Sequence, residues 1–565
     1  MTTTPLTIAV AQAKFATADL AVNTQKIVAI AKIAHGQGAD LLFLPELALS
    51  GVALQDLLTR ESFLCQQEEA LISLAAALAR FNGLSVVVGH LTLHEGQSFS
   101  SLSVLTEGEI KQTYRQPSVK SDQLLAAKHY SDNSSVSENN ILRLKGHSFA
   151  LTLGDDIWSS ACIQRFSEQG VQSILVADAT PYHAGRMAEY QKRLIDQLAE
   201  EQFNLFYTNH VGGHDELIYE GRSFLLNKEH ELQVEIDHFV EALAMYQVAA
   251  DNSCSCLEVQ SLVSDLEGGQ AGKKDTPKLL YQATESIESE LWRALVLSTE
   301  DFLRHSGIKK AMLGLSGGMD SALVLAVLYD AIGPENITAV MLSSQYTSQL
   351  SLDLAEDMAE RLGVVYHNIS IETMFKAYMD SFAPIFGDLP PDTTEENLQA
   401  RIRGVILMAL SNKLGGMIIC SGNKSEAATG YSTLYGDTVG GFAILKDVPK
   451  TMVYRLAKWR NIKQEIIPLG IITRPPSAEL AEGQVDQDSL PEYDVLDDIL
   501  YRLIELKQSS AEIIQAGFDA DTVNKISRLL KFNEYKRRQT APGPRISEGA
   551  FALDWRYPLS HGFSY

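Results

Sequence analysis

The 565-residue chain is poor in cysteine and has no long hydrophobic segment. Its five cysteines are scattered, without the paired spacing of a zinc site, so we expect reduced thiols. Crossing a bilayer takes about 20 consecutive apolar residues, and no run in the sequence approaches that length. The N-terminal residues lack the basic stretch and apolar core of a secretion signal. These absences predict a cytoplasmic protein without a membrane partner.

Positive charge is scarce as well. Lys and Arg number 47 against 71 Asp and Glu, which gives a net charge of −24 at pH 7. Because binding to a nucleic-acid backbone depends on clustered Lys and Arg, no nucleic-acid partner is expected. The chain is much longer than the roughly 250–300 residues at which a single hydrophobic core stops growing, so we expect two large domains.

Short apolar strands alternate with amphipathic helices in the first half of the chain. Strands are predicted at residues 6–11, 41–44, 84–89, 149–153, 173–177 and 203–208, and helices at 22–35 and 68–79. This pattern predicts a layered α/β domain over residues 1–255. The polar, Gly-rich stretch that follows predicts a linker over residues 256–285.

The second half shows the same alternation with longer helices. Strands are predicted at residues 311–315, 337–342, 365–371 and 417–420, and helices at 288–305, 350–363 and 394–414. Strands that alternate with helices predict a doubly wound parallel sheet over residues 286–565. Ligands of such sheets bind at the carboxyl ends of the strands.

A glycine-rich run, residues 314–321, follows the first of these strands and precedes a helix. Backbone amides in such a turn, together with the helix N-terminus, can bind phosphate, and Asp320 could hold the accompanying Mg²⁺. No Gly-Lys-Ser/Thr follows, so the run is not a Walker P-loop. Attack at the α-phosphorus of ATP is therefore favoured over γ-phosphoryl transfer. The alternative is an ordinary glycine-rich turn.

Further motifs in this half occur in a recognisable order. They are Tyr346–Ser351, Gly422–Tyr431, Tyr435–Asp437, Lys446–Lys450, Arg474–Glu479 and Tyr535–Arg538. With the glycine-rich run, they resemble the NAD⁺ synthetases over nearly all of residues 286–565. The resemblance implies a PP-loop (adenine nucleotide α-hydrolase-like) domain. It also implies ATP-dependent amidation of nicotinic acid adenine dinucleotide (deamido-NAD⁺), with release of AMP and pyrophosphate.

The same resemblance implies roles for individual residues. Those that would contact ATP are Gly314, Leu315, Ser316, Gly317, Gly318, Met319, Asp320, Ser321, Ser421, Lys450 and Ser477. Those that would contact deamido-NAD⁺ are Asn397, Arg401, Glu426, Tyr431 and Lys536. Asp320 and Glu426 would hold Mg²⁺. Taken singly, Glu426 could merely complement a helix dipole and Arg401 could be a solvated surface residue.

The first half resembles the nitrilase-type amidase domain of glutamine-using NAD⁺ synthetases. The resemblance rests on Leu44–Gly51, Tyr114–Arg115, Asp156–Trp158, Ala179–Gly185 and Val211–Leu217, and it implies a four-layer αββα sandwich. Such domains hydrolyse glutamine with a glutamate base, a lysine and a cysteine nucleophile. Glu46 matches the base, whereas the lysine position is Gln116 and the cysteine position is Gly154. We therefore expect an inactive glutaminase domain in which Glu46 is vestigial.

Two nearby residues could replace the missing groups, but neither is well placed in the sequence. Cys162 lies eight positions after Gly154, and Lys120 lies four positions after Gln116. A nucleophile must reach its base within about 3 Å. The expected nitrogen source is thus free ammonia, with an external donor as one possibility. The alternative is continued glutamine use through a non-standard nucleophile or a partner glutaminase.

Two other classes of function remain open at this point. One is an adenylating enzyme that acts on another nucleotide or on tRNA, and the other is an inactive scaffold. The acidic net charge and the dinucleotide motifs argue against the first class, and the retained glycine-rich loop, Glu426 and Lys450 argue against the second. The resemblance further implies a homo-oligomer built on a dimer of the synthetase domains.

Overall fold

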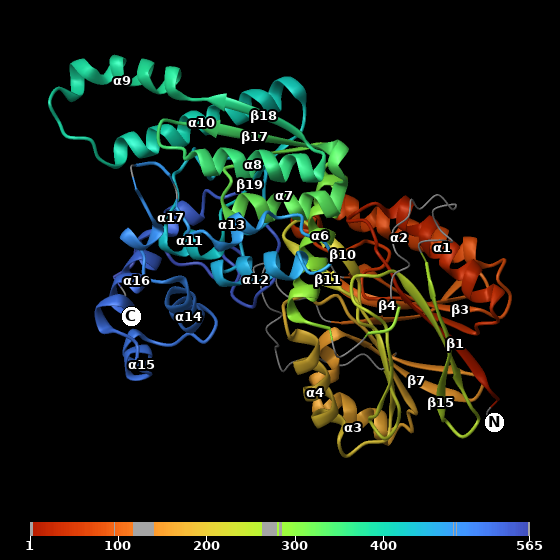
Figure 1. Ribbon diagram of the computed structural model, residues 1–565. Coiled ribbons are helices and arrows are strands. Elements are labelled where there is room, and N and C mark those ends of the chain that lie inside the picture. Colours follow the sequence, from red (N-terminus) through yellow and green to blue (C-terminus); the bar gives the residue numbers. More distant parts are fainter. Residues whose placement is uncertain are drawn as a thin grey trace. The chain divides into compact units, whose positions relative to one another are not determined.

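The computed structural model describes residues 4–94, 97–116, 140–262, 279–281, 285–477, 479–481 and 483–562 (Figure 1). It divides into two compact units, Met1–Glu285 and Ser286–Tyr565. In the part of the chain that the structure describes, no helix is both long and apolar enough to cross a membrane.

The first unit contains two large β-sheets. The seven-stranded sheet comprises, in spatial order, β15 (Cys254–Ser261), β14 (Ala242–Val248), β1 (Leu6–Gln12), β2 (Leu41–Phe43), β3 (Ser85–His94), β4 (Gln97–Thr106) and β5 (Glu109–Arg115). The six-stranded sheet comprises β13 (Leu232–Glu235), β12 (Phe224–Leu226), β9 (Asn204–Thr208), β8 (Ser173–Ala177), β7 (His147–Leu153) and β6 (Ile141–Leu144). A hairpin of β10 (Val211–His214) and β11 (Leu217–Glu220) accompanies them.

Alternating side chains along the strands explain how the layers form. On β1, Ile8 and Val10 pack into the core between the two sheets, whereas Ala9 and Ala11 pack under the helices on the outer face. Helices α1 (Leu20–Gly36) and α2 (Glu61–Leu78) cover one sheet, and α3 (Ser160–Glu168) and α4 (Arg186–Leu198) cover the other. The predicted αββα sandwich is confirmed.

The strand β15 changes one predicted boundary. It pairs antiparallel with β14 along its whole length, so residues 256–261 belong to the sheet and not to the predicted linker. Cys254 and Cys256 are half-buried and face the core between the sheets, while Ser255 between them is exposed. An edge strand with one solvated face has a polar composition, and this made it resemble a linker.

The second unit is built on one parallel sheet of five strands. Their spatial order is β18 (Val365–Ser370), β17 (Ile337–Ser343), β16 (Ala311–Gly314), β19 (Met417–Cys420) and β20 (Phe442–Ala443). From β16 the chain proceeds outward in one direction to β18, and from β19 in the other. The predicted doubly wound sheet is confirmed, and its switch point lies between β16 and β19. Ligand sites form at this point in such folds.

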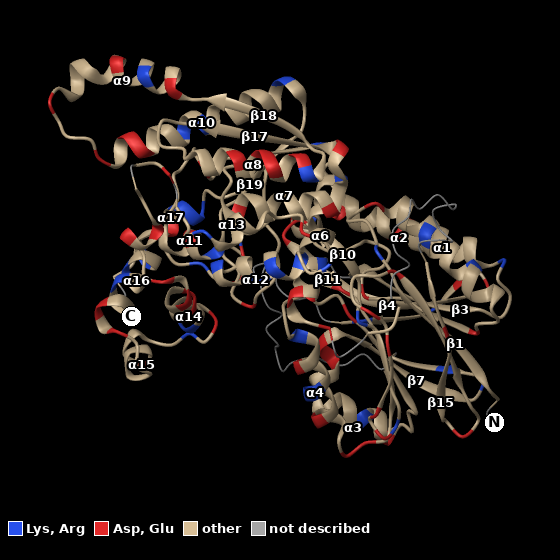
Figure 2. Ribbon diagram, in the orientation of Figure 1, with Lys and Arg blue, Asp and Glu red and all other residues tan. Residues whose placement is uncertain are grey.

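Helices surround this sheet and continue beyond it. They are α6 (Ile287–His305), α7 (Met319–Ile332), α8 (Gln349–Leu362), α9 (Glu372–Phe386), α10 (Thr393–Leu414), α11 (Lys424–Thr429), α12 (Lys450–Arg460) and α13 (Leu469–Thr473). The C-terminal helices α14 (Tyr493–Ile504), α15 (Ser510–Gln515), α16 (Ala520–Phe532) and α17 (Glu534–Arg537) follow. Leu496, Ile499, Val523 and Ile526 share a separate apolar core in this region. Acidic and basic residues are interspersed along the helices, and the charged residues of α8 are mostly acidic (Figure 2).

Candidate active site

The glycine-rich run forms the turn between β16 and α7. Gly317 has a φ of +73°, and a Cβ on it would lie 2.4 Å from the Ser351 carbonyl oxygen, so only glycine fits. The Ser316 and Ser321 hydroxyls lie 3.1 Å apart, and the Gly318 N–H donates to Ser316 Oγ. The helix α7 begins at Met319, earlier than predicted, which places Asp320 in its first turn. The turn therefore has the form of an anion-binding helix N-terminus.

A buried cation lies between two carboxylates beside this turn. The Lys450 ammonium, on the first residue of α12, forms an ion pair with Asp320 and lies 3.7 Å from Glu426 Oε1. Asn423 donates to Asp320 Oδ1 at 3.0 Å, and its own side-chain oxygen caps α11 by accepting from the Glu426 N–H. The fold thus brings residues of three separate sequence motifs into contact.

The charges of Asp320, Glu426 and Lys450 strongly affect one another. Burial and the Asp320 charge raise the pKa of Glu426 to about 8, although Lys450 opposes the shift. Burial alone would lower the pKa of Lys450, but the Asp320 and Glu426 carboxylates outweigh it, and the net shift is upward. The ammonium is therefore held charged, and the two acids repel each other across it.

A cavity of about 270 Å³ opens at the switch point of the sheet. All the residues predicted to contact ATP line it except Gly317: Gly314, Leu315, Ser316, Gly318, Met319, Asp320, Ser321, Ser421, Lys450 and Ser477. Glu426 and Tyr431 line it too. Burial and the nearby Asp486 raise the pKa of Tyr431, so its hydroxyl stays protonated.

The cavity also contains residues that the sequence did not identify. Among them are Arg403 on α10, and Arg474 and Glu479 after α13. Arg474 Nη1 donates to Ser351 Oγ at 2.7 Å and lies 3.7 Å from Glu479 Oε1. Arg474 and Glu479 stood inside a matched motif and could have been included. Arg403 could have been found only from its position on the helix relative to the sheet.

The other residues predicted to contact deamido-NAD⁺ do not line this cavity, but the fold gathers them around residues 430–434. Asn397 Oδ1 accepts from the Thr433 hydroxyl at 2.7 Å, and Arg401 Nε donates to the Leu434 carbonyl at 3.2 Å. Lys536 Nζ donates to the carbonyls of Gly430 and Ser432, both at 2.7 Å. Burial lowers the pKa of Lys536.

In the first unit, the predicted glutaminase positions lie close to Asp156. Glu46, which follows β2, is buried and accepts from the Ser100 hydroxyl at 2.6 Å. Gln116, which follows β5, donates to Asp156 Oδ1 at 2.8 Å. Gly154 follows β7 with a φ of +28°, in the region that favours glycine. Burial raises the pKa of Asp156, and the Glu46 charge adds to that shift.

Both halves of the chain match known families. A model described as carbon-nitrogen hydrolase matches residues 7–253, and one described as NAD synthase matches residues 291–540. The glutamine-dependent NAD(+) synthetase of Xanthomonas campestris pv. campestris is 41% identical, over 99% of this chain and 98% of that protein. Its namesake in Acinetobacter baylyi is 40% identical, over 96% of each.

The chain belongs to the NAD⁺ synthetase family. It is thus a ligase that couples a nitrilase-like domain to an NAD synthase domain. Among solved structures, glutamine-dependent NAD⁺ synthetase from Acinetobacter baumannii, in complex with ADP, is similar over 98% of both chains, with a TM-score of 0.73 and 36% identity. That of Cytophaga hutchinsonii, at 19% identity and a TM-score of 0.77, shares the fold.

Of the two possible replacement groups in the first unit, Cys162 lies among the described residues. Cys162 lies within α3, where it is buried against Ile163 and Phe166, and burial raises the pKa of its thiol. Such a thiol is a poor nucleophile. Lys120 lies outside the described residues.

Proposed function

We propose that this synthetase amidates deamido-NAD⁺ to NAD⁺, with cleavage of ATP to AMP and pyrophosphate, and that its nitrogen comes as ammonia. The nicotinate carboxylate attacks the α-phosphorus of ATP, and pyrophosphate leaves. Ammonia then attacks the acyl carbon, and AMP leaves. Adenylation is needed because a carboxylate lacks a good leaving group.

One observation carries the adenylation step: the glycine-rich turn and the Asp320–Lys450–Glu426 group line the same cavity. The N–H groups at the start of α7 would bind phosphate oxygens, and Lys450 would stabilise negative charge that develops there. The reaction needs little acid–base catalysis in this site, because orientation of the substrates and neutralisation of phosphate charge provide most of the rate enhancement.

The residues around Lys450 also fit Mg²⁺. Asp320 and Glu426 are two oxygen-bearing acids that repel each other, as the raised pKa of Glu426 indicates, and a hard divalent cation prefers such ligands. They would hold Mg²⁺, which when bound would neutralise charge on the phosphates. Lys450 and Asn423 would keep the Asp320 carboxylate oriented.

The ammonia proposal rests on the glutaminase positions of the first unit. Gly154 has no side chain to attack glutamine, and the neutral Gln116 amide donates to Asp156 and, at 3.4 Å, to the Leu153 carbonyl. The stabilising charge expected for a tetrahedral oxyanion is therefore missing. The relatives named above are called glutamine-dependent. For this chain, glutamine use would need a partner glutaminase or a different nucleophile.

A second copy of the chain would complete the assembly in this proposal. Exposed apolar side chains on and beside helices α9 and α10 support a dimer of synthetase units: Tyr378, Ile385, Leu389, Val405, Met408 and Leu414. No residue of α9 is buried. Exposed patches of this kind mark protein contacts. A monomeric sedimentation coefficient at micromolar concentration would overturn this part of the proposal. The remaining expectation, a cytoplasmic location, stays a prediction.

The activity is tested with the purified chain, ATP, Mg²⁺, deamido-NAD⁺ and ammonium chloride. We expect NAD⁺, AMP and pyrophosphate in equal amounts, with no AMP when deamido-NAD⁺ is omitted. Formation of ADP and phosphate would contradict attack at the α-phosphorus. Release of pyrophosphate without NAD⁺ would point to adenylation of another acceptor.

A further inference from the structure

Helix α10 carries two arginines with different surroundings. Arg401 and Arg403 are two residues apart, which places them roughly 200° apart around a helix of 3.6 residues per turn. Arg401 is exposed and does not line the cavity, whereas Arg403 is half-buried and does. Arg403 Nε donates to the Leu342 carbonyl at 2.9 Å, near the carboxyl end of β17. The helix thus directs one of its two arginines to the ligand edge of the sheet.

The Arg403 charge is poorly compensated compared with the other cations of the cavity. Lys450 is paired with Asp320, and Arg474 lies within 3.7 Å of Glu479. Arg403 forms no ion pair with any described carboxylate, and its two terminal nitrogens make no hydrogen bond to a described residue. Burial lowers the pKa of Arg403 to about 10. The negative charge of Glu479, which forms no ion pair with Arg403, opposes this shift.

A guanidinium held in this way suits an anion that arrives with the substrate. Its Nε is fixed by protein, and its remaining donors form a planar fork that matches two oxygens of a phosphate. An anion in the cavity would also supply the compensating charge that the described protein residues do not. A lone structural arginine would instead pair with an acid or with several carbonyls.

We propose that Arg403 is a nucleotide-binding residue whose guanidinium binds a phosphate oxygen of ATP in the cavity. This inference rests on the proposed function, which places ATP there. It assigns Arg403 to the adenine nucleotide and leaves Arg401 with the group of residues around 430–434.

The test is calorimetric binding of ADP, which needs no turnover, to the intact chain and to Arg403→Gln, Arg403→Lys and Lys413→Gln. We expect Arg403→Gln to weaken ADP binding about 10- to 100-fold, the loss of a charge-assisted hydrogen bond. Arg403→Lys should recover most of the affinity, because it keeps the charge. Lys413→Gln, at an exposed position of the same helix outside the cavity lining, should bind ADP as the parent chain does. AMP and pyrophosphate are titrated separately, and one of them should lose affinity with Arg403→Gln.

Three results would overturn the inference. The first is parental ADP affinity in Arg403→Gln. The second is unchanged affinity for both AMP and pyrophosphate, which would exclude a phosphate contact. The third is an equal loss in Arg403→Lys with a lowered melting temperature in both variants, which would show that Arg403 only tethers α10 to Leu342. If the parent chain itself fails to bind ADP, the proposed function fails instead.

Discussion

Replacing Lys450 with methionine is expected to lower the rate of NAD⁺ formation by about 100- to 1,000-fold. In other enzymes, removal of one preorganised donor that stabilises transition-state charge has an effect of this size. The variant keeps the apolar stem and removes the charge. Asp320 and Glu426 would then lie together without the cation between them, so Glu426 should be protonated more readily still. The cavity would lose both a phosphate-binding charge and the ion pair that orients Asp320.

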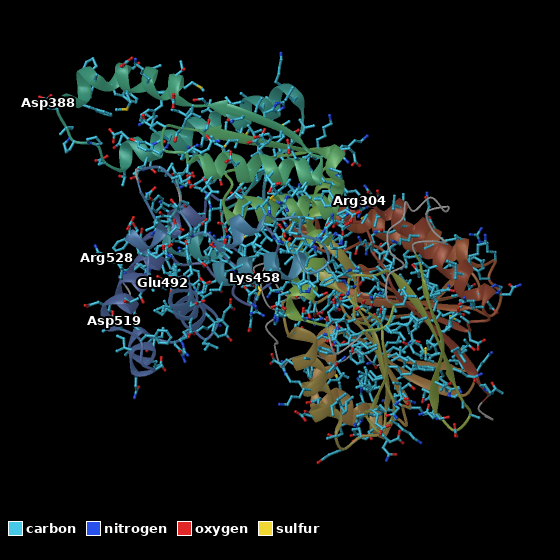
Figure 3. The ribbon with its side chains drawn as sticks, in the orientation of Figure 1. Arg304, Asp388, Lys458, Glu492, Asp519 and Arg528 are labelled. Atoms are coloured by element: carbon cyan, nitrogen blue, oxygen red, sulfur yellow. The ribbon has the colours of Figure 1, made fainter. Side chains whose placement is uncertain are left out.

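The matched control for this variant is Lys458→Met on the same helix. Lys458 (labelled in Figure 3) is exposed and is not among the residues that line the cavity. Pyrophosphate release should be unchanged in Lys458→Met. Assays below the melting temperature of each variant separate lost chemistry from lost folding. A decrease of less than about threefold in Lys450→Met would contradict the role given to this ammonium.

Replacing Asp447 with alanine is expected to destabilise the synthetase unit by about 3–5 kcal/mol, the usual cost of removing one partner of a buried ion pair. Asp447 is buried, and its carboxylate lies 2.9 Å from Lys424 Nζ. It also accepts from the N–H groups of Ile546 and Ser547 and from the Ser547 hydroxyl. The Asp447 carboxylate therefore connects the C-terminal segment, at Ile546 and Ser547, to the loop between β20 and α12.

The loss of stability should be large although Lys424 would still form an ion pair with a second carboxylate. Lys424 Nζ still has Glu505 at 2.9 Å, but three donors of the C-terminal segment would be left without their acceptor. Urea unfolding followed by tryptophan fluorescence measures the change. The control is Asp388→Ala at an exposed position (Figure 3), which should shift stability by less than about 0.5 kcal/mol. A change below about 1 kcal/mol in Asp447→Ala would show that this network is not structural.

Much of the synthetase unit could be predicted because its signals are local. The strand at residues 417–420 and the helix ending at Leu414 follow from periodicity, and the glycine-rich turn follows from composition. The helix α7 begins at Met319, inside the predicted glycine-rich run, because Met319–Ser321 belong both to that motif and to the first turn of the helix. The strand β15 was missed because its residues are mostly polar, and only its pairing with β14 identifies it as an edge strand.

The parts of the site that local signals could not give depend on tertiary contacts. The ion pair of Lys450 with Asp320 joins residues 130 positions apart, and the Gln116 bond to Asp156 spans 40. Gln116 could be recognised as a substitution from the sequence, but its new hydrogen bond could not. Arg403 lacked any motif signal, since its importance arises from where α10 crosses the sheet.

The claim that most needs a direct test is that the chain no longer makes its own ammonia. The measurement is NAD⁺ formation by the pure chain, with ATP and deamido-NAD⁺ saturating, in ammonia-free glutamine and in ammonium chloride. We predict sustained turnover with ammonium and none above the nitrogen-free background with glutamine, and no glutamate released. Adding an unrelated active glutaminase should restore synthesis from glutamine. Comparable turnover with glutamine alone, accompanied by stoichiometric glutamate, would contradict the account.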